Sequence, residues 1–114
     1  MALALFVLPA ASHASTAAAE KAYDQGKYSQ AEKDYAAALA KSAKSATAPK
    51  LAFNLGSAAY KSGNYAQAAT AFENTLHTPD VPVQQNAYYN LGNTQYRVGQ
   101  ATEKASPQET IKTW

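Results

Sequence analysis

Residues 86–99, NAYYNLGNTQYRVG, repeat a pattern that residues 51–63, LAFNLGSAAYKSG, already show. Asn-Leu-Gly, a tyrosine four positions later and a closing glycine all return after 36 positions. A fixed period of this size is typical of stacked structural repeats. We therefore expect the chain to form a row of similar units.

The spacing of apolar residues predicts that each unit is a pair of helices. Apolar side chains recur at intervals of three and four, as on the buried face of an amphipathic helix. The pattern predicts helices from residue 15 to the glycine at 26 and over residues 28–40, 51–62, 65–76 and 83–98. The turns at Gly26 and Gly63 are so short that the helices on either side must form antiparallel hairpins. Residues 41–49 and 77–82 connect one hairpin to the next.

Beyond Gly99 the pattern changes. Residues 100–106 are polar and predict an extended turn. Ser106-Pro107-Gln108-Glu109 then reads as a capping box with proline at the first helical position, so a new helix is expected from Pro107. We interpret the unit that begins at residue 83 as incomplete and the chain as a fragment or a truncated product.

The first residues, MALALFVLPAASHA at 1–14, resemble a secretory signal. An apolar stretch is followed by the helix breaker Pro9 and by small residues that end at Ala14, although the usual basic start is missing. The alternative is a tail or frayed helix that packs on the first unit. The segment is too short to span a bilayer. We expect a periplasmic or exported protein that meets a membrane only through an uncleaved leader or a partner.

Composition favours thin helical layers and excludes several classes of function. The 114 residues suffice for one small domain, alanine is abundant, and eight tyrosines are spread along the chain. The net charge of +2 arises from interspersed charges without a basic patch, so nucleic-acid binding is not expected. The absence of cysteine excludes disulfides and thiolate metal sites.

The inventory of reactive side chains predicts no catalytic site, no metal site and no cofactor. The two histidines are His13, inside the possible leader, and His77, at a predicted helix end where a helix dipole favours it. The carboxylates show no metal-ligand spacing, and every glycine has a place in the repeat rather than in a phosphate-binding loop. We therefore do not expect an enzyme.

Within each hairpin, glycine, aromatic and small residues follow at fixed offsets. They are Gly26, Tyr28, Ala31, Tyr35 and Ala38 in the first unit, and Gly63, Tyr65, Ala68, Phe72 and Thr75 in the second. Together with Asn-Leu-Gly this pattern resembles the tetratricopeptide repeat. The resemblance implies an all-α, right-handed superhelical stack of antiparallel hairpins, with a hairpin at 15–48, a second repeat at 49–82 and an incomplete third at 83–114. Ala18-Ala19 in place of Leu-Gly and Thr75 in place of alanine depart from the family pattern.

The resemblance also implies a non-catalytic scaffold that binds a partner peptide or domain in a concave groove lined by the first helix of each unit. By repeat register the groove residues are Lys50, Phe53, Asn54, Ser57, Tyr60, Lys61, Asn86, Tyr89, Asn90, Asn93, Tyr96 and Arg97. The alternative is that Asn54 and Asn90 bond to a neighbouring helix while Tyr60 and Tyr96 only pack. One subgroup of the family clamps terminal carboxylates with basic residues, but of the corresponding positions here only Asn54 fits. A neutral groove for an extended or helical peptide is expected instead.

A narrower resemblance covers residues 86–114. YYNLGNTQYRVGQ, a polar insert and SPQETIKTW are similar to the repeat proteins of the Bacteroides aerotolerance operons. That resemblance implies a role in a bacterial envelope assembly, with von Willebrand A domain proteins and a MoxR-type ATPase as associated proteins. Two alternatives stay open: an accessory region of a longer envelope enzyme whose catalytic part lies beyond residue 114, and a structural spacer.

Overall fold

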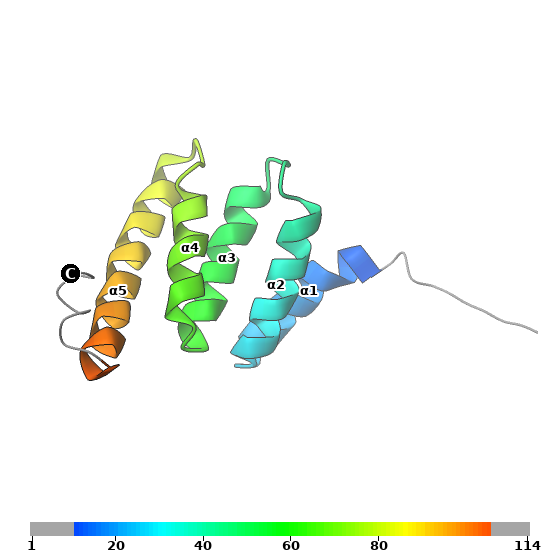
Figure 1. Cartoon of the computed structure of the whole chain (residues 1–114). Coiled ribbons are helices and arrows are strands. Elements are labelled where there is room, and N and C mark those ends of the chain that lie inside the picture. Colours follow the sequence, from blue (N-terminus) through cyan, green and yellow to red (C-terminus); the bar gives the residue numbers. More distant parts are fainter. Residues whose placement is uncertain (1–10, 106–114) are drawn as a thin grey trace, which may run out of the picture.

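The computed structural model describes residues 11–105, and side chains from residue 16 onward; this part of the chain is a row of five α-helices (Figure 1). They are α1 (Ala11–Asp24), α2 (Tyr28–Lys41), α3 (Ala48–Lys61), α4 (Tyr65–Thr75) and α5 (Val81–Ala105). Each helix packs mainly against the helix before it and the helix after it, and α3 also touches α5. The all-α prediction is confirmed. None of the described helices has a segment long and apolar enough to cross a membrane.

Two glycine turns close the hairpins α1–α2 and α3–α4. Gly26 and Gly63 have φ angles of 76° and 85°, in the left-handed region that glycine adopts without a steric penalty. After Gly26, the amide of Lys27 donates to the carbonyl of Ala22 at 2.8 Å, and the equivalent bond after Gly63 joins Asn64 to the carbonyl of Ala59. This pattern is the Schellman motif, which satisfies carbonyls at a helix end.

An aromatic pair spans each of these turns. Tyr23 and Tyr28 meet edge to face with ring centroids 5.2 Å apart, and Tyr60 and Tyr65 repeat the contact at 5.3 Å. Such pairs contribute about 0.5–1.5 kcal/mol beyond the area they bury. The pairs hold the end of one helix against the start of the next.

Small side chains let the helices approach closely. The main cluster joins α1, α2 and α3 and consists largely of buried alanines around Tyr35, Leu51 and Leu55. The second cluster, Ala59, Ala68 and Phe72, joins α3 to α4, with Leu91 of α5 packed against it. The aromatic rings at repeat positions therefore fill the layers between alanine-lined helices.

At Gly56, helix α3 lies directly against the Phe72 ring of α4. A Cβ added there would lie 2.7 Å from the ring of Phe72, which is only 1% exposed. The same ring also meets Phe53 edge to face at 5.6 Å. The glycine of the Asn-Leu-Gly motif thus makes room for Phe72, the aromatic residue of the repeat pattern in the second helix of the same unit.

The predicted boundaries hold to within a few residues until Gly99. Helix α1 begins at Ala11 rather than at residue 15, α3 begins at Ala48 with Pro49 in its first turn, and α5 begins at Val81. The extended turn predicted at residues 100–106 is wrong for 100–105, because α5 continues through Gly99 to Ala105. The predicted helix from Pro107 and the first ten residues of the possible leader lie outside the described residues.

Candidate functional site

Side chains from four helices converge on a groove on one side of the row. Tyr23 of α1, three residues of α3, Phe72 of α4 and two asparagines of α5 line it, and its volume is about 260 Å³. We call it the α1–α3–α5 groove; it is lined by Tyr23, Ser57, Tyr60, Lys61, Phe72, Asn90 and Asn93. Rings, amides and one ammonium group therefore face the same space.

Tyr60 is held in place from both sides. Its ring packs on Tyr65, and its hydroxyl accepts a hydrogen bond of 3.2 Å from Nε of Arg97. A second guanidinium nitrogen of Arg97 donates to Gln100 at 3.3 Å. The hydrogen bond to Tyr60 is the largest cause that raises the pKa of Arg97 above its ordinary value. The guanidinium thus remains charged and ties the end of α3 to α5 beside the groove.

Lys61 and the asparagines supply the polar groups of the groove. Nζ of Lys61 lies 5.8 Å from the centroid of the Tyr28 ring, within the range of a cation–π contact. The side-chain amides of Asn90 and Asn93 make no hydrogen bond within the part of the chain that the structure describes. The alternative that Asn90 bonds to a neighbouring helix is therefore not what the structure shows. Each free amide can both donate to and accept from a peptide backbone.

Five of the twelve predicted groove residues line the groove: Ser57, Tyr60, Lys61, Asn90 and Asn93. Phe53 does not, because its ring packs on Phe72 between α3 and α4. Asn54 is half-buried without lining the groove, and Lys50 and Asn86 are exposed elsewhere. Tyr89 and Tyr96 are 71% and 53% exposed, and Arg97 acts at the rim through Tyr60.

Two lining residues were missed. Tyr23 lies 37 positions before Tyr60, the same offset that relates Gly26 to Gly63, so extending the repeat alignment to the first unit would have found it. Phe72 was named only as a position of the repeat pattern, and in the structure it also lines the groove while its ring lies against Gly56.

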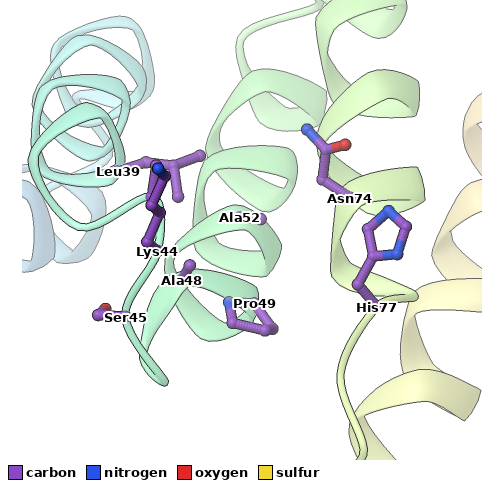
Figure 2. A pocket seen from close by; sticks show the side chains of 9 residues that line it. Leu39, Lys44, Ser45, Ala48, Pro49, Ala52, Asn74 and His77 are labelled. Atoms are coloured by element: carbon purple, nitrogen blue, oxygen red, sulfur yellow. The ribbon is translucent and has the colours of Figure 1, made fainter.

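A larger cleft of about 470 Å³ lies between α2 and α4 (Figure 2). Leu39 and Lys44 form one wall, and Ala48, Pro49 and Ala52 of α3 form the floor. Asn74 of α4 and His77, just after the end of α4, face them from the other side. We call it the α2–α4 cleft. Small apolar side chains and the α2–α3 connection form most of its walls. Fewer polar side chains line this cleft than line the α1–α3–α5 groove.

No group of three or more histidine, cysteine, aspartate or glutamate side chains is arranged to hold a metal ion among the described residues. Among these side chains, Glu32 accepts hydrogen bonds from Ser62 and Asn64.

Comparison with known proteins gives one result. The sequence matches the tetratricopeptide repeat family over residues 16–60 and again over residues 53–106. The two matches together span the described helices from α1 to α5. Neither curated proteins nor solved structures gave a significant match.

Proposed function

Because the chain belongs to the tetratricopeptide repeat family, whose members bind other proteins, we propose that it binds an extended segment of a partner protein in the α1–α3–α5 groove. The observation that carries this proposal is the convergence of Tyr60, Lys61 and Asn90 from two different units on one space. A solenoid brings equivalent positions of successive units together in this way, and a ligand then contacts several units at once.

The groove chemistry suits a neutral or weakly acidic peptide. The rings of Tyr23, Tyr60 and Phe72 offer an apolar surface for a side chain of the ligand. The free amides of Asn90 and Asn93 match the alternating donors and acceptors of an extended backbone. Lys61 supplies a positive charge for a carbonyl or carboxylate of the ligand.

A peptide selection tests this proposal. Random peptides displayed on phage are selected against the whole chain, and the bound peptides are then measured against variants in solution. Asn90→Ala and Asn93→Ala should each weaken binding by about tenfold, as expected when a ligand loses an anchoring contact. Asn74→Ala is the matched control, because it removes the same amide from the α2–α4 cleft. Equal losses in Asn74→Ala, or peptides that bind the asparagine variants as tightly as the parent, would contradict the proposal.

The cellular setting is a further part of the proposal. The pattern of residues 1–14 and the resemblance of residues 86–114 to the aerotolerance repeat proteins support export and a role in a bacterial envelope assembly. The partner class they suggest is a von Willebrand A domain protein. Amino-terminal sequencing after expression in an exporting bacterium tests export, since a protein that still begins at Met1 would argue against it. Binding of a purified von Willebrand A domain protein, with Asn90→Ala and Asn74→Ala as test and control, examines the partner.

A further inference from the structure

The α2–α4 cleft and the α1–α3–α5 groove use different parts of helix α3. Residues between Ala48 and Ala52, near the start of α3, line the cleft, whereas residues between Ser57 and Lys61, near its end, line the groove. No residue lines both. The remaining walls of the cleft come from α2, the α2–α3 connection and the end of α4. A ligand in the groove therefore leaves the cleft open.

Small side chains of α3 make the floor of the cleft. Ala48 and Ala52 occupy the places that the larger residues Gln84 and Tyr88 take 36 positions later. The resulting volume of about 470 Å³ lies within the range of about 300–1,000 Å³ that is common for ligand-binding pockets. The cleft can therefore admit a large apolar side chain of a ligand.

The polar residues on the far wall are not required by the repeat. Asn74 and His77 lie 37 positions after Ala37 and Ala40, the offset that relates the two glycine turns. All of these side chains are exposed. Because alanine suffices at these positions in the first unit, helix packing does not call for an amide or an imidazole in the second.

The polar groups around the cleft are available to a ligand. Figure 2 shows Lys44 on one side of the cleft and Asn74 and His77 on the other. Within the part of the chain that the structure describes, none of these three side chains makes a hydrogen bond or an ion pair. The cleft thus combines an apolar floor with unpartnered polar groups on both sides.

The charge around the cleft is positive. Lys44 lines the cleft, and no carboxylate is among its lining residues. Residues 35–72 contain several lysines and no acidic residue. Glu73, the acidic residue next to Asn74, is exposed and does not line the cleft. An acidic ligand complements this charge, whereas a basic ligand would be repelled.

From these observations we propose that the α2–α4 cleft is a second protein-binding site, which takes a short acidic segment of a partner protein. A large apolar side chain of the segment fills the cleft above Ala48 and Ala52. An aspartate or glutamate next to it in the segment pairs with the ammonium group of Lys44. The amide of Asn74 and the imidazole of His77 bond to the backbone of the segment from the other side. With the groove still free, one chain can hold two proteins together.

A peptide selection that disfavours the groove tests the proposal. Random peptides displayed on phage are selected against the whole chain with Asn90→Ala and Asn93→Ala in its groove. The enriched peptides should carry a large apolar residue next to an aspartate or glutamate. Fluorescein-labelled copies of these peptides are then titrated with the chain and followed by anisotropy. Failure to enrich any peptide, or enrichment of neutral or basic peptides alone, would overturn the proposal.

Two substitutions locate the bound peptide. Ala48→Leu fills the cleft and should weaken binding at least about tenfold. Lys44→Gln removes the charge and should weaken binding about threefold to fivefold, as expected for an exposed ion pair. Ala66→Leu on α4 and Lys33→Gln on α2 make matched changes at exposed positions outside the cleft and should leave binding unchanged. Circular dichroism checks that each variant folds. A peptide that tolerates both cleft substitutions would overturn the proposal.

A double-mutant cycle tests the charge pairing. Replacing the acidic residue of the peptide by its amide should weaken binding to the parent chain, and Lys44→Gln should then have no further effect. Added salt should also weaken binding of the acidic peptide, because the pair is exposed to solvent. Additive effects of the two changes would refute the pairing with Lys44.

Competition separates this proposal from the proposed function. The acidic peptide should bind the parent chain together with a peptide selected for the groove, and Asn90→Ala should weaken only the groove peptide. Competition between the two peptides would place both in the groove and would overturn a second site. Sedimentation equilibrium examines the other occupant: a dimer of the chain that Ala48→Leu dissociates would place a second copy in the cleft, against the proposal. Failure of the groove peptide alone would count against the proposed function and leave the cleft result standing.

Discussion

The carboxylate of Glu32 accepts a hydrogen bond of 2.8 Å from the side-chain amide of Asn64, so the second helix of one hairpin is tied to the turn of the next. The hydroxyl of Ser62 donates to the other oxygen of the same carboxylate at 2.7 Å. Glu32 is only 9% exposed, and both oxygens are used. This carboxylate fixes how the two hairpins stack, in addition to the packing of alanines between α2 and α3.

Removing this link should destabilise the stack. We expect Glu32→Ala to lower the free energy of unfolding by about 1–3 kcal/mol, because two hydrogen bonds to a charged acceptor are lost. Urea unfolding followed by circular dichroism measures the change. Lys33→Ala, at the exposed neighbouring position, is the control and should change little. In a double-mutant cycle, Glu32→Ala and Asn64→Ala should be coupled by about 0.5–2 kcal/mol, and strict additivity would show that the hydrogen bond contributes nothing.

The two glycines of the repeated motif should respond in opposite ways to alanine. Gly56→Ala should destabilise the chain by about 1–3 kcal/mol, because the new methyl group would overlap the buried ring of Phe72. Gly92→Ala should stabilise the chain by about 0.5–1 kcal/mol, because alanine favours the helix and meets no atom of the described residues within 4 Å. Thermal and urea unfolding give both values. Combining Gly56→Ala with Phe72→Leu should recover part of the loss, and an equal response of the two glycines would refute the assigned contact.

Ala68 should not accept a larger side chain. It is fully buried between Ala59 and Phe72, so Ala68→Leu should cost about 1–3 kcal/mol through overpacking. Ala66→Leu, on the exposed side of the same helix, provides the comparison. If Ala68→Leu melted at the temperature of the parent, the helix contact placed at this residue would be wrong.

Tyr35 should make the fold sensitive to alkaline pH. Burial is the main cause that raises its pKa above the ordinary value of 10.0, and the nearby charges of Glu20 and Asp24 add to it. Above pH 10 the unfolded chain therefore loses this proton before the folded chain does, and stability falls as pH rises. Tyr35→Phe should reduce this alkaline loss, since phenylalanine already occupies the equivalent position 72. Unfolding midpoints between pH 9 and pH 11 provide the measurement, and an unchanged slope in the variant would count against the role of Tyr35. Tyr88→Phe, at an exposed position, is the control.

The hairpins were predictable because their determinants are local. Gly26 and Gly63 are each followed, two positions later, by a tyrosine that packs back on the helix before the turn. Gly99 has alanine at the corresponding position, residue 101, so no aromatic ring at this position can pack on the preceding helix. Residues that favour helix then follow, so α5 continues where a turn was predicted. The glycine alone was a weaker signal than the glycine together with its aromatic residue.

The candidate site was less predictable, because its determinants lie between units. Asn54 and Asn90 occupy the same place in the repeated motif, yet only Asn90 lines the groove. Phe53 and Tyr89 are also equivalent, yet Phe53 packs on Phe72 while Tyr89 faces solvent. Repeat register predicts which side of a helix a residue occupies. Whether a neighbouring helix covers that side depends on the position of the unit in the row.

The packing of each helix on its immediate neighbours also determines how the structure comes apart. Among the described helices, opening α1 breaks contacts mainly with α2, whereas opening α3 breaks contacts with α2, α4 and α5. Because most contacts join helices that follow one another in the sequence, the fold has a low contact order. Structure can therefore propagate from one hairpin to the next during folding. Backbone amides of α3 should therefore exchange with solvent last, and those of α1 should exchange early through local fraying.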